Sequence, residues 1–192
     1  MKKILILILT ILFLNILIVY AQDIDIGASA IDRATSAPAD YTFISKENPA
    51  NASGTITQVE IWANTNLSNC EVATFYSTGT NKFSTRDYET IDSVTSGSKK
   101  TFDVDLAVEA GDYIGMFYSS GRMERDNSGE GYWLSIETKD KIPCTDTTFT
   151  FTADRTISLY GTGNTSSVGI KWNTVTINKF NTIEISKWNT ME

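Results

Sequence analysis

The residue types that this chain lacks restrict its chemistry first. The 192 residues include no histidine, which removes the commonest general base and metal ligand, together with the Ser-His and Cys-His nucleophile arrangements. Paired carboxylates remain, because two acids about 5 to 10 Å apart suffice for glycoside hydrolysis. The candidates are Glu124, Asp126, Glu130 and Glu137. Since 23 acidic side chains form many such pairs by chance, we predict a protein that is not an enzyme, with a carboxylate-based glycan-active enzyme as the minor alternative.

The stretch 119–134 has the composition of a ligand-binding loop. It contains three glycines and places charged side chains between aromatic ones. Sugar recognition needs an aromatic face and a few fixed polar groups, and this stretch supplies both. The predicted ligand-binding residues are Tyr118, Arg122, Glu124, Arg125, Asp126, Tyr132 and Trp133. In the alternative interpretation the three aromatics belong to the core and the charges to a solvated loop. Trp62, inside a dense strand, is expected to be core.

A metal site is not predicted. The segment 126–130, Asp-Asn-Ser-Gly-Glu, offers oxygen ligands of the kind that Ca²⁺ takes. It lacks the full alternating acidic register of a calcium loop. We therefore predict no cofactor, with Ca²⁺ at this segment as the one weak exception.

Cys70 and Cys144 are the two cysteines of the chain. In an exported protein an even pair indicates one disulfide, which would close a loop of about 75 residues and stabilise the fold by about 4 kcal/mol in the chain-entropy model. Two buried free thiols are the alternative, because the sequence does not place the two Cα atoms in bridging geometry.

The elements that position these residues are predicted to be strands. No long stretch keeps the 3.6-residue apolar period of a helix, whereas apolar and polar residues alternate through 101–108, which is typical of a strand with one wet face. Further strands are expected at 23–27, 59–63, 72–76, 149–151 and 157–160, separated by Gly, Asn, Ser and Thr clusters. Closely spaced strands with no helix between them predict an all-β fold, an antiparallel sandwich or barrel, and of these we expect the β-sandwich.

The segment 106–118 holds a strand, a Gly111-Asp112 turn and an apolar strand with aromatic residues. This arrangement resembles the central hairpin of jelly-roll modules such as the complement globular head and tumour necrosis factor families, over about thirteen residues. The resemblance implies a jelly-roll-like sandwich that serves as a trimeric, non-enzymatic recognition head.

The N-terminus has the features of a signal peptide. Lys2 and Lys3 precede a long apolar run, and Val19-Tyr20-Ala21 fits a signal-peptidase site. We predict a signal peptide at 1–21, with an uncleaved membrane anchor as the alternative. Removing two of the 16 basic residues leaves 14 against 23 acids, a net charge of −9. Because the basic residues are scattered among acids, nucleic acid is not an expected partner.

The C-terminal residues 170–192 repeat with an eight-residue step, in units that begin at Lys171, Lys179 and Lys187. An even step returns each side chain to the same face of a strand, whereas it turns a helix by about 800°, so the repeat is β-type. The units resemble the Lys-apolar-Asn-Gly tandem repeats in tails of uncharacterised bacterial and phage surface proteins, with Thr where Gly usually follows Asn.

The predicted organisation is a signal peptide at 1–21, a sandwich domain at 22–162, a linker at 163–169 and three repeats at 170–192. The repeats are too short to bury a core alone, so they pack on the domain, pair between chains or stay disordered. We expect homo-oligomerisation through them.

Together these features predict an exported recognition module, secreted or at the cell surface, that binds a glycan or surface polymer. No stable membrane insertion is expected after leader cleavage. A purely structural envelope, matrix or fibre component is the alternative. Exposure of Tyr132 or Trp133 would favour binding, and burial of both would favour structure.

Overall fold

The structure, a computed structural model, describes residues 22–165. The predicted signal peptide, the linker residues 166–169 and the three repeats lie outside the described residues. Residues 22–165 form twelve strands and no helix, so no helix in this range is long and apolar enough to cross a membrane. The prediction of an all-β, antiparallel sandwich is confirmed.

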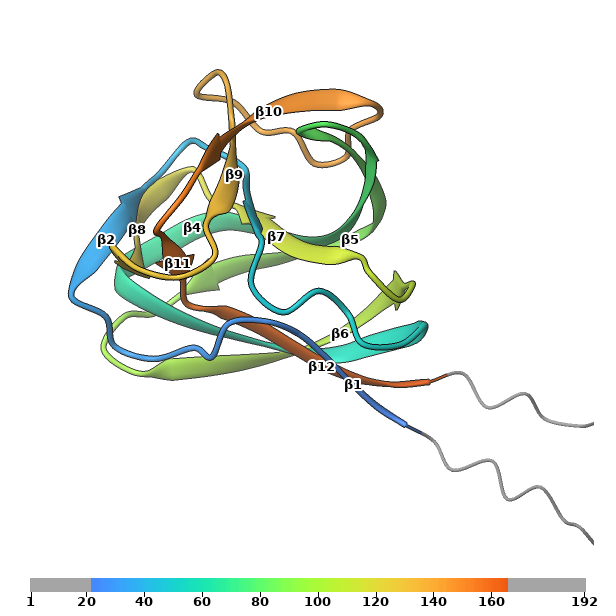
Figure 1. Ribbon diagram of the computed structural model, residues 1–192. Helices are drawn as coiled ribbons and strands as arrows, with labels where there is room; N and C mark the ends of the chain where they lie inside the picture. Colours follow the sequence, from blue (N-terminus) through green and yellow to red (C-terminus); the bar gives the residue numbers. More distant parts are fainter. Residues whose placement is uncertain (1–21, 166–192) are drawn as a thin grey trace, which may run out of the picture.

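The strands follow one another along the chain as shown in Figure 1. Their bounds are β1 (Asp23–Gly27), β2 (Thr35–Pro38), β3 (Phe43–Ser45), β4 (Gly54–Gly79), β5 (Lys82–Val94), β6 (Lys99–Val108), β7 (Tyr113–Phe117), β8 (Ser120–Asp126), β9 (Tyr132–Ser135), β10 (Thr147–Thr152), β11 (Thr156–Ile157) and β12 (Leu159–Thr165).

Strand β4 joins the two layers of the sandwich. It is 26 residues long and contains both segments, 59–63 and 72–76, that the sequence predicted as separate strands. The polar run between them does not end the strand, because the pairing register shifts between Ala63 and Thr65, between Thr65 and Ser68, and again before Cys70. Such bulges bend a strand while it continues. The N-terminal half of β4 therefore lies in one layer and the C-terminal half in the other.

The first layer, which we call the terminal layer, contains both ends of the described chain. Its strand order is β1-β12-β4-β6. Alternate residues of these strands are fully buried, among them Ile26, Ile61 and Leu106. The residues between them form an outer face that is mostly polar and exposed or half-buried. This is the pattern of a sheet with one dry and one wet face.

Strand β12 corrects the predicted linker. It continues through Gly163, Asn164 and Thr165, which pair with β4, and Asn164 and Gly163 also pair with β1. A Cβ atom at Gly161 would lie 2.8 Å from the Ile26 side chain, and one at Gly163 would overlap the backbone of Thr55. The glycines that resemble a flexible linker are therefore strand positions at which the neighbouring strands approach closely.

In the second layer, which we call the ring layer, six strands pair in a closed cycle, β4-β5-β10-β9-β3-β7 and back to β4. One face of these strands forms an aromatic core of its own, with Phe75, Phe83, Trp133 and Phe149. The other face contributes Phe43, Val72 and Met116 to the main core, which they share with the terminal layer. The short strands β2, β8 and β11 extend this layer beside β4.

The turn at Gly111-Asp112 forms as predicted, but the strands on either side of it do not make a hairpin ladder. β6 pairs with β4 at Gly54–Trp62, and β7 pairs with β4 at Glu71–Phe75. The two strands therefore belong to different layers. The buried Asp112 holds the turn, because its carboxylate accepts hydrogen bonds from Arg86 of β5 and from the Glu109 backbone.

The two ends of the described chain leave the domain side by side. The Thr165 backbone N–H bonds the Gln22 carbonyl at 3.1 Å, and the Gln22 N–H bonds the Thr165 hydroxyl at 2.9 Å. Figure 1 shows β1 and β12 running together to this point.

Candidate functional site

The structure does not place the predicted aromatic residues on a surface loop. The range 119–134 includes strands β8 and β9. Tyr118 is fully buried, Tyr132 is 4% exposed and Trp133 is 9% exposed. Tyr118 stacks on Phe43 at 6.0 Å between ring centroids, and its hydroxyl donates to the Ala37 carbonyl at 3.1 Å. These three side chains are core residues, and the predicted aromatic platform is wrong.

The predicted acidic ligands serve an internal network. Glu124 is 2% exposed, and its carboxylate accepts hydrogen bonds from the Asn64 amide at 2.7 Å and the Arg33 backbone at 3.1 Å. Asp126 pairs with the Arg33 guanidinium at 2.8 Å, and this hydrogen bond lowers the pKa of Asp126 below its usual value. Arg33 also donates to the Ser158 hydroxyl at 2.8 Å. Both carboxylates therefore hold the segment before β2 onto β8.

The two predicted arginines lie along the seam between β8 and β2. Arg122 donates to the Ser36 hydroxyl at 2.7 Å, and Arg125 donates to the Thr35 hydroxyl at 3.3 Å and to the Asn127 side chain at 3.1 Å. The four charged residues of the predicted site thus lie on one strand, β8, but as structural contacts, whereas Tyr132 and Trp133 lie on β9.

The remaining acids and the calcium segment have internal partners as well. The Glu130 backbone N–H donates to the Glu47 carboxylate at 2.6 Å, and the Glu130 carboxylate lies 3.6 Å from Lys46. Glu137 lies 3.6 Å from Lys141. Within residues 22–165, no group of three or more Asp, Glu, Cys or His side chains is arranged to hold a metal ion.

The two cysteines are free thiols, which corrects the predicted disulfide. Cys70 lies in the main core opposite Asp92, whereas Cys144 bonds Thr85, the partner of Phe75. Phe75 lies five residues along β4 from Cys70, about 16 Å at strand spacing, and a disulfide needs Cα atoms about 4.4 to 6.8 Å apart. Burial raises the pKa of the Cys70 thiol to about 12.

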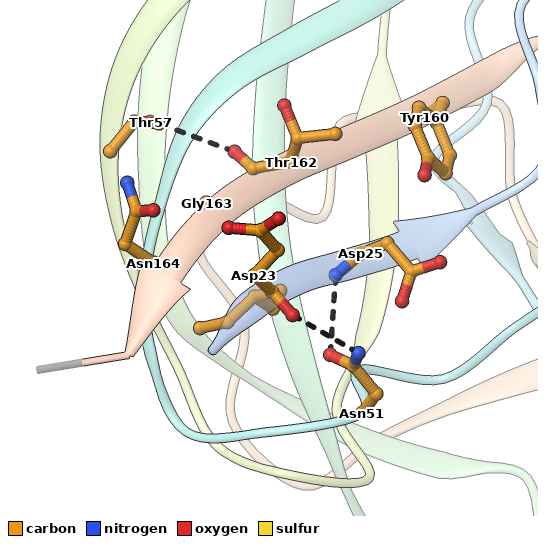
Figure 2. Close-up of a pocket in the computed structure, with 9 residues that line it drawn as sticks. Asp23, Asp25, Asn51, Thr57, Tyr160, Thr162, Gly163 and Asn164 are labelled. Atoms are coloured by element: carbon orange, nitrogen blue, oxygen red, sulfur yellow. Dashed lines mark hydrogen bonds between the residues drawn. The ribbon is translucent and has the colours of Figure 1, made fainter. Parts of the chain in front are cut away.

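A polar hollow lies on the outer face of the terminal layer (Figure 2). Its volume is about 520 Å³. It is lined by Asp23, Ile24, Asp25, Asn51, Thr57, Tyr160, Thr162, Gly163 and Asn164. Two carboxylates, two carboxamides, two hydroxyl groups and one phenol ring therefore surround one open space. The strands β1, β12 and β4 supply all of these residues except Asn51, which comes from the segment before β4.

The side chain of Asn51 fixes one wall of the hollow. Its amide donates to the Asp23 carbonyl and its oxygen accepts from the Asp25 backbone N–H, both at 3.2 Å (Figure 2). Asn51 thus occupies the free edge of β1 as a short strand would. On the other wall, the Thr57 hydroxyl lies 3.5 Å from the Thr162 carbonyl. The backbone around the hollow is therefore held by paired groups, while the side chains of Asp23 and Asn164 are exposed.

Tyr160 is the aromatic member of the hollow. It is half-buried, pairs with Glu60 of β4 and lies beside Asp25. Partial burial, with the negative charges of Asp25 and Glu60, raises the pKa of its hydroxyl above the usual value. The phenol is therefore neutral at physiological pH and can donate a hydrogen bond.

Trp62 extends this face, although the sequence predicted it to be a core residue. Ile61 and Ala63 are fully buried on either side of it, while Trp62 is partly exposed. Strand alternation therefore places Trp62 on the outer face rather than in the core.

The sequence did not predict a site on this face, because its polar residues follow the alternation of any solvent-exposed strand. Asp23 and Asp25 alternate with buried isoleucines, and Tyr160 and Thr162 alternate with glycines. The same alternation describes any solvated strand face. The pairing of β1 with β12 joins residues that lie from 133 positions (Gly27 and Tyr160) to 141 positions (Asp23 and Asn164) apart in the sequence, and it brings the two polar rows together.

Comparison with known proteins adds no family to this description. No protein-family model matches the chain, and no match was found among curated proteins or solved structures.

Proposed function

We propose that this protein is an exported, non-enzymatic recognition module that binds a glycan or surface polymer through the outer face of its terminal layer. The observation that carries the proposal is the open hollow beside Tyr160, with its seven polar or aromatic side chains. Sugar sites combine an aromatic face, which packs against the C–H groups of the ring, with fixed polar groups for the hydroxyls. The hollow supplies both on rigid strands.

The proposal also covers where the protein is located and how its copies assemble. The signal peptide predicted at 1–21 places the domain outside the cell, either secreted or at the cell surface. The sandwich serves as a jelly-roll-like head comparable to the complement and tumour necrosis factor heads, and the repeats join several copies of the chain. The net charge of the mature chain disfavours nucleic acid, and after leader cleavage nothing in our proposal requires insertion in a membrane.

A glycan array probed with the full mature chain tests the binding proposal. We expect binding to one class of glycan and a loss of at least about tenfold in affinity for Tyr160→Ala. The matched control is Tyr88→Ala, because Tyr88 is 43% exposed on β5 in the ring layer. Equal losses for both variants would contradict the assignment of the hollow. Release of new sugar ends during incubation would instead support the glycan-active enzyme.

The second candidate is a purely structural component of an envelope, matrix or fibre. Burial of both Tyr132 and Trp133 favours it, because the aromatics of 119–134 build the core and offer no binding surface. If this candidate is right, the array should show no glycan binding. Assembly of the protein should then depend on the chain ends alone.

A further inference from the structure

The outer face of the terminal layer carries two partly exposed aromatic side chains on neighbouring strands. Tyr160 of β12 pairs with Glu60 of β4, and Trp62 lies two residues further along β4. Residues two apart in a strand point to the same face, so Glu60 and Trp62 share the face that Tyr160 occupies. The aromatic contacts for a ligand therefore do not end at the hollow.

The strand register sets the length of this surface. Asn164 pairs with Thr55 and Tyr160 pairs with Glu60, so Trp62 and Asn164 lie in opposite directions from Tyr160. Four residues separate Tyr160 from Asn164, and two separate Glu60 from Trp62. At about 3.3 Å per residue, the path from Asn164 to Trp62 is about 20 Å long, which is several times the length of one sugar ring.

The charges at the hollow select against anionic ligands. Asp23 and Asp25 line the hollow, and none of its nine lining residues is basic. Glu60, beside Tyr160, is already paired with Lys99 at 2.6 Å. A sulfate or carboxylate on the ligand would therefore meet like charges with no cation at the hollow to pair with it. An uncharged sugar meets hydrogen-bond partners without this repulsion.

We propose that this surface binds an internal stretch of an extended, uncharged glycan chain, which lies along β12 and β4 from the hollow to the Trp62 ring. The inference rests on the proposed function and adds the length and the charge of the ligand. Tyr160 and Trp62 each pack against one sugar unit, and the hydroxyl, carboxamide and carboxylate groups of the hollow bind the hydroxyls of further units.

Calorimetric titration of the full mature chain tests this proposal. The probes are the neutral glycan that the array identifies, with glucose and N-acetylglucosamine oligomers as the starting series, in lengths of one to six units, and a uronic acid oligomer of six units. We expect the six-unit neutral oligomer to bind at least tenfold more tightly than the two-unit oligomer, and the uronic acid oligomer to bind at least tenfold more weakly than the neutral one.

Single substitutions distinguish the contributions of the two ends of the surface to binding. Trp62→Ala should remove most of the gain with length, whereas Tyr160→Ala should weaken the binding of short and long oligomers alike. Trp62→Tyr keeps a ring and should keep most of the gain, and thermal melting of each variant verifies that it is folded. Equal affinity for short and long oligomers, or preference for the anionic one, would overturn this inference and leave the proposed function in place. Absence of any glycan binding would overturn both.

Discussion

At the residue scale, the aromatic side chains separate into those that build the ring and those that remain on a surface. Trp133 packs against Phe83 at 4.7 Å and Tyr113 at 5.1 Å between ring centroids, and its indole N–H donates to Asn81 at 2.8 Å. The charged and glycine-rich sequence around Trp133 resembles that around a sugar-binding tryptophan. Strand pairing with Ile44 and Phe151 decides the matter, because it turns the ring inward.

Truncating the Trp133 side chain should therefore lower the stability of the fold. We expect Trp133→Ala to reduce the free energy of unfolding by about 3 to 5 kcal/mol, because the change leaves a cavity among packed rings. Urea denaturation measures this, with Tyr88→Ala as an exposed control that should change stability far less. A Trp133→Ala variant as stable as the parent would mean that Trp133 lies outside the core.

The free cysteines make a second prediction at this scale. Thiol titration of the native protein should find two unpaired thiols, with Cys144 reacting first, because it is partly exposed and Cys70 is fully buried. Cys70 should react only on unfolding, since its raised pKa also keeps it from forming the thiolate. Reducing agent should not move the melting temperature. A bridged pair in the native exported protein would refute this geometry.

Glu71 gives the fold a pH dependence whose sign can be stated. Burial, together with the adjacent Asp140, raises the pKa of Glu71 above its ordinary value of 4.5, and one of its carboxylate oxygens is buried without a hydrogen-bond partner. The folded state therefore binds this proton more tightly than the unfolded state does. The resulting stabilisation is full below pH 4.5 and is lost as the pH rises through the raised pKa.

Replacing Glu71 with glutamine removes that titration. We expect Glu71→Gln to be more stable than the parent at pH 7, by less than about 1 kcal/mol because Glu71 is only partly buried, and to show no gain at pH 4. Denaturation at both pH values measures the difference. Asp140→Asn should give the same trend, and a larger gain at pH 4 than at pH 7 would contradict the sign.

At the element scale, side chains protect the open edges of the terminal layer. The free edge of β6 is covered from β5, where Glu89 accepts the Asp105 backbone N–H at 2.8 Å and Asp87 accepts that of Ala107 at 2.9 Å. Asn51 covers the free edge of β1 in the same manner. An uncovered edge of this kind pairs with strands of other molecules.

Removing the two acids on β5 should expose the β6 edge. In the domain that ends at Thr165, we expect the double variant Asp87→Ala, Glu89→Ala to self-associate at concentrations at which the parent domain stays monomeric, as measured by light scattering. Asp105→Ala removes an exposed carboxylate of β6 itself and is the matched control, because it leaves both caps in place. Unchanged mass for the double variant would show that the edge is protected by something other than these carboxylates.

The elements also show which parts of the fold are predictable. Apolar and polar residues alternate cleanly in 101–108 and 23–27, and both are strands in the structure. The predicted strand 157–160 is divided at Ser158 between β11 and β12. A local pattern does not show which strands pair with each other. The bulges that keep β4 continuous, and the close approach of neighbouring strands that requires Gly161, depend on residues far along the chain. For the same reason, the site on the outer face was not predicted.

At the scale of the whole molecule, both chain ends leave from one place. Gln22 and Thr165 exchange hydrogen bonds at the end of β1 and β12. A tail attached at Thr165 therefore starts beside Gln22, the predicted mature N-terminus, and within one strand length of the proposed binding hollow. Assembly through the tail would place the outer faces of several copies near a common base.

The repeats supply a reason for such assembly. Each unit offers an aromatic side chain, Trp172, Phe180 or Trp188, with aliphatic residues and one lysine, and a single tail has no second layer against which to bury them. The edges of its own terminal layer are already covered by Asn51 and by the acids of β5. Pairing between identical tails would bury these side chains against each other.

We therefore predict that the tail drives homo-oligomerisation. Truncation after Thr165 should give a folded monomer, because it keeps every residue of β12, whereas truncation after Thr162 would remove three residues that pair with β4. Light scattering compares the mass of the full mature chain with that of the domain ending at Thr165, and replacement of the three tail aromatics by serine should act like truncation. Equal masses for the full and truncated chains would contradict the role of the tail, and would leave packing on the sandwich or simple disorder as the explanation.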